Sequence, residues 1–254
     1  MCIRDRASIV LIVFGWLSGC NFRLAGKDWG VVFLLSLLRA VTSFSLIIAY
    51  QNIASGVAST IHFMYPLAVA LAMMFFFREK KSLLVILAVL MSLLGAALLS
   101  LGELEAKSGN TMVGLVAACV SVFSYAGYIV GVRTTRAVQI NSTALTCYVM
   151  GLGTIFYLIG AYCTSGLQLV SDGYTWLIIL GLALPATAIS NITLVQAIKY
   201  AGPTLTSILG AMEPLTAVVI GVFVFKELFT VNSAVGIILI LLAVSIVVFR
   251  RQKS

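Results

Sequence analysis

Long apolar runs alternate with short polar stretches along almost the whole chain. Eight of the runs hold 19 to 22 residues, which is about the length that an α-helix needs to cross the hydrocarbon core of a bilayer. The first run is shorter, with 14 residues. We therefore predict nine transmembrane helices, at residues 7–20, 30–50, 56–77, 83–101, 112–132, 144–163, 174–194, 204–225 and 231–249.

Composition agrees with this pattern. Hydrophobic residues make up 61% of the 254 residues and charged residues only 9%, far from the balance of a soluble domain. The polar stretches are too short to form a soluble domain of their own. We predict an all-α polytopic membrane protein that has the lipid bilayer as its environment.

The basic residues report orientation. The net charge of +8 lies in short loops between apolar runs, so it predicts topology and no nucleic-acid partner. With nine helices, one side receives eleven Lys and Arg residues, and the loops between helices on the other side hold only Lys107 and Lys226. The basic side is predicted to be cytoplasmic, which places the C-terminus there in a multi-pass protein of the bacterial inner membrane.

The same count leaves two basic residues at the beginning of the chain on the side that is otherwise poor in positive charge. Arg4 and Arg6 precede the first run and would lie on the outer side. A further helix upstream of this chain would explain them, and we expect one. The ending LSGC at Cys20 is also similar to a lipoprotein signal, but the eight apolar runs that follow favour a transmembrane helix over a cleaved leader.

Two stretches of the chain repeat each other at a distance of 148 residues. Placing residues 54–82 on residues 202–230 pairs seven identical residues, among them Pro66 with Pro214 and Glu79 with Glu227. The two predicted helices are five steps apart, an odd number, so the copies point in opposite directions through the membrane. We predict a first repeat of four helices at 7–103, truncated at its N-terminus, a linker at 104–111, and a second repeat of five helices at 112–250.

The runs LLRAVTSFSLIIAYQNIASGVASTIHFMYPLAVALAMMFFFREKKS, ILGAMEPLTAVVIGVFVFKELFT and MSLLGAALLSLG resemble the two EamA units of the drug/metabolite transporter superfamily. The resemblance covers nearly all of the chain after residue 7 and implies a fold of ten helices in two inverted repeats of five. It also implies that the chain moves amino acids, other metabolites or drugs across the bacterial inner membrane, mostly outward.

Inserting a charged side chain near the middle of a transmembrane helix costs about 2.5 to 3.5 kcal/mol of free energy on insertion scales. Glu213 lies ten residues into its predicted helix. It is either a protonated carboxyl bonded to a neighbouring helix or part of a polar cavity, and we favour the cavity. Arg39 lies nine residues after Gly30. It either extends toward the cytoplasmic face or holds a carboxylate or phosphate of the solute, and it could instead pair with Glu213.

Further polar residues fall within the apolar runs. His62, the one histidine, lies three residues before Tyr65, so the two share a helix face. We favour a hydrogen-bonded core residue over a proton carrier for His62. Tyr125 and Tyr128 are also three apart and either line a cavity or bond between helices. Asn191 is in the helix aligned with that of Arg39 and is a candidate lining residue.

Several motifs are absent from the sequence. There is no GxxxxGK[ST] run for a nucleotide, no HExxH or GxSxG, and no cysteine pair at metal-ligand spacing. We therefore expect neither an enzyme nor a bound cofactor or metal.

Together these features predict a secondary transporter for a small-molecule solute, such as an amino acid, another metabolite or a drug, that works by alternating access with protons as a candidate coupling ion. The alternatives are a non-cycling scaffold or sensor protein and an uptake permease, and the oligomeric state stays open. Pro66 and Pro214 mark places where helices bend. The predicted cavity residues are Arg39, His62, Tyr65, Tyr125, Tyr128, Asn191 and Glu213.

Overall fold

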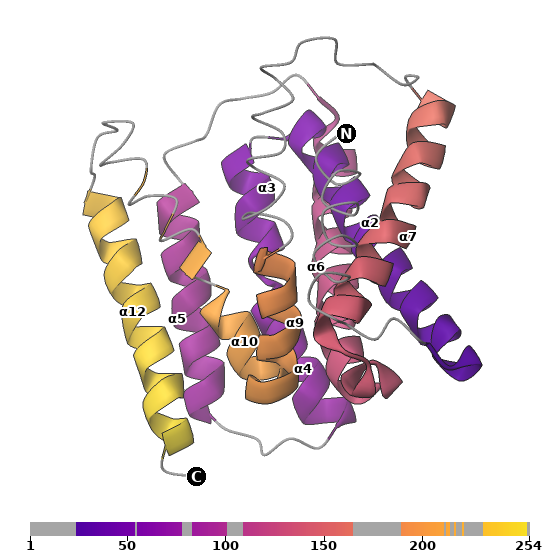
Figure 1. Cartoon of the computed structure of the whole chain (residues 1–254). Helices are drawn as coiled ribbons and strands as arrows, with labels where there is room; N and C mark the ends of the chain where they lie inside the picture. The colour runs from indigo at the N-terminus through magenta and orange to yellow at the C-terminus, as the bar shows by residue number, and fades with distance from the viewer. Residues whose placement is uncertain are drawn as a thin grey trace. The chain divides into compact units, whose positions relative to one another are not determined.

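A computed structural model of the chain describes residues 24–53, 55–77, 83–100, 109–164, 189–210 and 231–252, with positions 212, 213, 216 and 220. Within these ranges every regular element is a helix (Figure 1), as the apolar pattern predicts. The elements are η1 Gly26–Asp28, α2 Trp29–Asn52, α3 Ser55–His62, α4 Tyr65–Phe76, α5 Leu83–Ser100, α6 Thr111–Thr134, η3 Arg136–Gln139, α7 Ser142–Thr164, α9 Ser190–Ala201, α10 Pro203–Leu209 and α12 Val231–Gln252.

Most described helices coincide with a predicted apolar run. Among the residues described, three stretches are long and apolar enough to cross a membrane, Gly26–Asn52, Val57–Phe76 and Thr111–Thr134. Shorter apolar helices occur at Leu83–Gly95 and Ser142–Phe156. The predicted run at 7–20, most of the run at 174–194 and half of the run at 204–225 lie outside the described residues.

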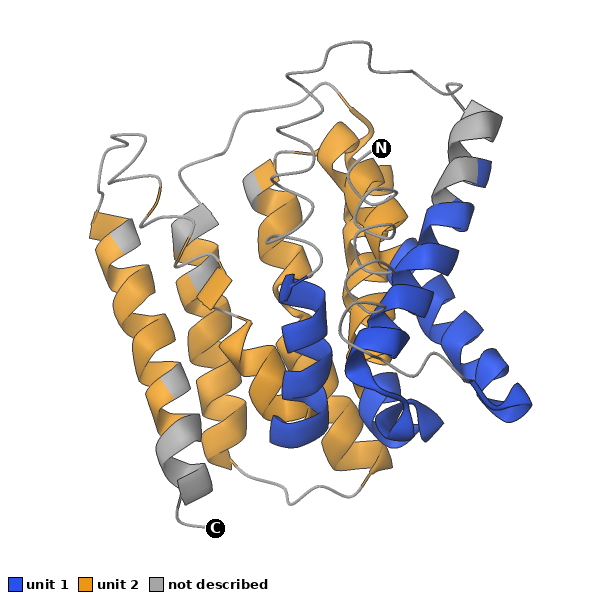
Figure 2. Ribbon diagram, viewed as in Figure 1, with its two compact units in different colours: residues 1–40, 131–201 blue, residues 41–130, 202–254 orange. Residues whose placement is uncertain are grey.

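The chain divides into two compact units (Figure 2). Unit 1 comprises residues 1–40 and 131–201, and unit 2 comprises 41–130 and 202–254. Two of the three boundaries fall inside α2 and α6, so each of these helices contributes residues to both units, and the third follows the end of α9. The division groups residues by contact and does not test the repeats predicted at 7–103 and 112–250, which stay predictions.

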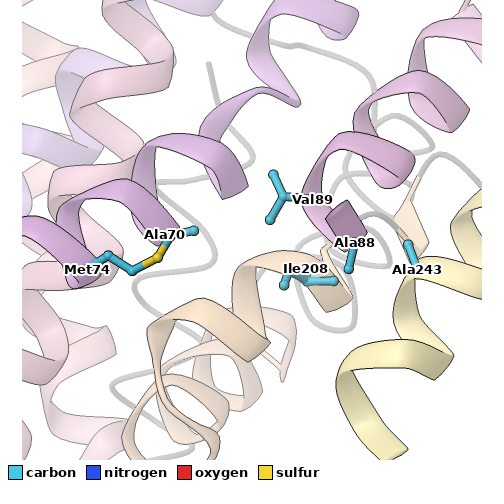
Figure 3. Close-up of a cluster of buried hydrophobic side chains, with 6 residues drawn as sticks. All are labelled: Ala70, Met74, Ala88, Val89, Ile208 and Ala243. Atoms are coloured by element: carbon cyan, nitrogen blue, oxygen red, sulfur yellow. The ribbon is translucent and has the colours of Figure 1, made fainter. Parts of the chain in front are cut away.

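Unit 2 is held by apolar side chains from four helices. Its cluster of buried residues comprises Ala70 and Met74 of α4, Ala88 and Val89 of α5, Ile208 of α10 and Ala243 of α12 (Figure 3). Helices α5 and α12 also approach closely at small residues. A Cβ atom at Gly95 would lie 2.7 Å from the carbonyl oxygen of Gly236, and such contacts favour association of helices in lipid.

Two predicted helices are interrupted. The run 56–77 is divided into α3 and α4 by a turn at Phe63 and Met64, and α10 ends at Leu209 with a turn at Gly210. In the sequence a proline follows four residues after His62 and four after Gly210. Proline has no N–H to donate to the carbonyl one turn earlier, so the interruption between α3 and α4 falls beside Pro66, where a bend is predicted.

Helix α9 also differs from the prediction. It continues to Ala201, whereas the predicted apolar run ends at Leu194 and places Lys199 in the turn before the next run. The residues that follow Leu194 are good helix formers even though several are polar. The helix stops at Gly202, whose φ of 88° is unfavourable for other residues, and Pro203 then begins α10.

Candidate functional site

Four of the predicted cavity residues form one aromatic cluster in unit 2. Tyr65 and Tyr125 meet edge to face, with ring centroids 4.7 Å apart, and His62 lies against Tyr125 at 5.4 Å with the rings inclined by 29°. Tyr128 lies parallel to Tyr125 with centroids 6.3 Å apart. The three tyrosines are buried, with at most 6% of each exposed. We call these four residues the aromatic cluster.

The His62 ring is oriented by a serine on α6. His62 Nδ1 lies 2.9 Å from Ser121 Oγ, and the Ser121 hydroxyl itself donates to the carbonyl of Ala118 at 2.6 Å. The serine hydroxyl thus lies between the imidazole and the backbone of its own helix. The contact joins α3 to α6 and fixes the orientation of the imidazole ring beside Tyr125.

A second polar contact lies on the same helix. Ser124 Oγ lies 2.9 Å from Thr42 Oγ1 of α2, and it also donates to the carbonyl of Val120. Both side chains are buried. Among the described residues, every buried side-chain nitrogen or oxygen has a hydrogen-bond partner. Unit 2 thus contains a satisfied polar region within apolar helices.

Glu213 is connected to the aromatic cluster through the turn that ends α10. Its backbone N–H donates to the carbonyl of Gly210 at 3.0 Å, and the Tyr65 hydroxyl lies directly against Gly210. The Glu213 side chain is exposed. The two residues that the repeat alignment makes equivalent, Tyr65 and Glu213, therefore flank one glycine.

Arg39 and Asn191 meet in unit 1. Arg39 Nη2 donates to Asn191 Oδ1 at 3.0 Å, which joins α2 to α9. An amide oxygen orients a guanidinium but carries no charge to neutralise it. The predicted pairing of Arg39 with Glu213 is not tested, since the two residues belong to different units.

The end of α9 is fastened by two cations in the same unit. Arg133 Nη1 donates to the carbonyl of Lys199, and Lys199 Nζ donates to the carbonyl of Ile140. We call these contacts the lysine clasp. Lys199 lies beyond the predicted membrane run, and burial lowers its pKa from 10.5 to about 8 because the charged form loses hydration.

Sequence reasoning identified the polar residue types and missed several of their partners. Pro66 is the second residue of α4 and is buried, while Pro214 lies outside the described residues. Thr42 and Gly210 were not predicted, and neither stands out in sequence because small residues are common in membrane helices. In the part of the chain that the structure describes, no three His, Cys, Asp or Glu side chains gather as metal ligands.

Comparison with known proteins places these features in a family. The sequence model of the EamA-like transporter family matches residues 6–101 and 112–249. This chain belongs to the EamA-like transporter family. An EamA-like chain is a multi-pass membrane protein of the drug/metabolite transporter superfamily, and transport of a small molecule is the class of function that membership assigns. Membership of a transporter family also implies that the chain is not an enzyme.

Individual relatives agree with the family. An uncharacterized transporter of Archaeoglobus fulgidus is 28% identical over 238 residues, which cover 92% of this chain and 83% of that protein. A solved crystal structure of another protein is 18% identical and has a TM-score of 0.82, covering 99% of this EamA-like chain and 87% of that chain. The second likeness shows a shared fold.

Proposed function

We propose that this EamA-like chain is a secondary transporter that moves a small solute, such as an amino acid or another metabolite, across the bacterial inner membrane by alternating access. The observation that carries the proposal is a pair of helix interruptions. Helix α3 ends at His62 and α10 ends at Leu209. These ends differ by one position in the register of the 148-residue repeat.

Interrupted helices are a recurrent feature of transporter binding sites. Irregular backbone at membrane depth is tolerated where it is buried in protein or lines a polar cavity, and broken helices of two inverted repeats often form the solute site. Here both interruptions lie beside polar side chains, His62 and Tyr65 at one and Glu213 at the other. The family match in two separate stretches is a second support for two repeats.

The side chains suit a zwitterionic solute. The guanidinium of Arg39 matches a carboxylate, and the carboxylate of Glu213 matches an ammonium group or a proton. An amino acid carries both charged ends. The proposed lining residues are Arg39, His62, Tyr65, Tyr125, Tyr128, Asn191 and Glu213. Direction follows from the gradients, so the same pathway serves export or uptake.

A flux assay with Glu213→Gln tests the proposal. Purified protein in proteoliposomes is offered a panel of the standard amino acids, with and without a pH gradient. The unaltered chain should move at least one solute, and faster under the gradient. Glutamine keeps the shape of the side chain but cannot bind a proton in this range, so Glu213→Gln should transport at the same rate with or without the gradient.

Asp28→Asn is the matched control, because it removes a carboxylate from the short helix η1 ahead of α2. This variant should respond to the gradient as the unaltered chain does. Unchanged coupling in Glu213→Gln would reject Glu213 as the coupling group. Movement of no solute in the panel, by any variant, would count against transport and for a non-cycling membrane protein.

A further inference from the structure

Gly210 ends α10 in a conformation that does not require glycine. Its φ of −58° and ψ of −23° fall in the right-handed helical region that all residues favour. The reason for a glycine is therefore the space around it. A Cβ atom at this position would overlap the Tyr65 hydroxyl oxygen and lie 3.1 Å from Tyr65 Cζ, inside the contact distance of about 3.5 Å.

Tyr65 has little room to withdraw. Its side chain is 3% exposed, and its ring packs edge to face on Tyr125 at 4.7 Å and lies 5.7 Å from His62. Tyr125 in turn lies against His62. Because close-packed interiors transmit displacement, a shift of Tyr65 caused by a side chain at position 210 would also disturb its contacts with these two neighbours.

Gly210 also positions the backbone of Glu213. The carbonyl of Gly210 accepts a hydrogen bond from the Glu213 N–H at 3.0 Å. The same glycine therefore contacts the Tyr65 hydroxyl and forms the turn that contains Glu213. A displacement at Gly210 therefore reaches the aromatic cluster on one side and Glu213 on the other.

We propose that Gly210 is a positioning residue whose missing side chain seats the Tyr65 hydroxyl and so sets the aromatic cluster relative to Glu213. The contact itself is independent of transport. Its effect on solute passage rests on the proposed function, because it acts through Tyr65 and Glu213.

A double-substitution cycle tests whether Gly210 positions the Tyr65 hydroxyl. Full-length protein is prepared unaltered and as Gly210→Ala, Tyr65→Phe and the double variant, each labelled with 3-fluorotyrosine. Tyr65→Phe assigns the fluorine signal of Tyr65, and Gly210→Ala should shift that signal. Removing the hydroxyl removes the overlap with the new Cβ, so the loss of thermal midpoint caused by Gly210→Ala should be about half as large or smaller in the Tyr65→Phe background.

A part of the loss should persist in the Tyr65→Phe background, because the new Cβ would also lie 3.0 Å from the carbonyl of Ser207. The matched control is Gly151→Ala, whose Cβ meets nothing within 4 Å and which should leave the Tyr65 signal in place. If Gly210→Ala cannot be purified, recovery of the double variant supports the seat.

Three results would overturn the proposal: a Tyr65 signal unmoved by Gly210→Ala, an equal loss of midpoint in both backgrounds, or failure of the double variant to fold along with the single one. The fluorine and thermal measurements need no solute. An absence of flux in the proteoliposome panel would thus bear on the proposed function alone, while the cycle would still decide whether Gly210 seats Tyr65.

Discussion

Arg39 and Asn191 combine a cation with a neutral amide inside apolar helices. The 3.0 Å hydrogen bond directs one edge of the guanidinium to α9, and the neutral amide adds no negative charge beside it. An aspartate at position 191 would have nearly the same shape but would add a negative charge. This difference separates a structural role of the pair from a role in binding a carboxylate.

We predict that Asn191→Asp has opposite effects on stability and binding. The new ion pair should hold α2 to α9 more firmly, so the thermal midpoint in detergent should stay or rise. Neutralising Arg39 should weaken binding of a solute carboxylate, raising the KM for solutes of that class roughly tenfold, which corresponds to about 1.4 kcal/mol. The measurements are a thermal unfolding curve and a flux titration.

Asn141→Asp provides the control, since Asn141 caps α7 through its Oδ1 atom and aspartate can accept the same bonds. It should change neither the midpoint nor the KM appreciably. A fall in the midpoint of Asn191→Asp with an unchanged KM would mean that Arg39 serves packing and does not meet the solute carboxylate.

At this scale the sequence predicts which residues are polar but not what they contact. Arg39, Asn191 and His62 are recognisable because each interrupts an apolar run. The partners Ser121 and Gly210 depend on how neighbouring helices are rotated, and the apolar pattern of a membrane helix hardly encodes that rotation, since lipid-facing and buried positions are both hydrophobic.

Among the elements, the corner between α9 and α10 depends on one glycine. Gly202 has φ 88° and ψ 158°, a region that is essentially limited to glycine. A Cβ there would meet nothing within 4 Å, so any penalty of substitution comes from the backbone alone.

We predict that Gly202→Ala lowers stability by about 1 to 3 kcal/mol, the usual cost of holding a residue in a sparsely populated region. Gly153→Ala should do the reverse. Gly153 lies inside α7, and an added Cβ also meets nothing within 4 Å, so alanine should stabilise the helix by about 0.5 to 1 kcal/mol. Thermal unfolding of the two variants in detergent checks both signs. A lower thermal midpoint in both variants would contradict the prediction for Gly153→Ala and would indicate that the space beside that glycine is itself required for stability.

Helix bounds were predictable where polar loops flank an apolar run, as for α2 and α6, and less so where chemistry overrides hydropathy. The extension of α9 to Ala201 shows that polar residues such as Lys199 continue a helix until a glycine and a proline stop it. The turn at Phe63 and Met64 shows that a proline shortly afterwards interrupts a helix without any change in hydropathy. Pro66 and Pro203 indicate from sequence where these interruptions fall, but the extent of each interruption depends on packing.

For the molecule as a whole, the lysine clasp makes stability depend on pH. Burial lowers the pKa of Lys199 from 10.5 to about 8. Between pH 8 and pH 10.5 the unfolded chain binds more protons at this residue than the folded chain does. The stability of the folded state should therefore rise with pH through this window.

Lys199→Met should flatten this rise, because methionine has no proton to lose. Thermal midpoints measured between pH 8 and pH 10.5 for the unaltered chain and the variant check the expectation. Lys27→Met removes an exposed lysine from η1 and should keep the rise. An equal slope in the unaltered chain and in Lys199→Met would assign the dependence to other groups.

At the same scale, class and family were predictable from the sequence, whereas the contacts within each unit were not. Apolar runs of bilayer length and the motifs around Pro66 and Pro214 led to a polytopic membrane protein and the EamA resemblance, both confirmed by the family match. The two inverted repeats stay a prediction. Contacts such as Arg39 with Asn191 join residues 152 positions apart, and no local pattern specifies them.

The seat of Tyr65 on Gly210 has a consequence for how this chain can change by descent. A side chain at position 210 overlaps the tyrosine hydroxyl and so destabilises the chain while Tyr65 is present, whereas the hydroxyl can be lost first without a clash. One order of mutations therefore costs less stability than the other: loss of the hydroxyl at position 65 followed by gain of a side chain at 210, so retention of Tyr65 favours retention of glycine at 210.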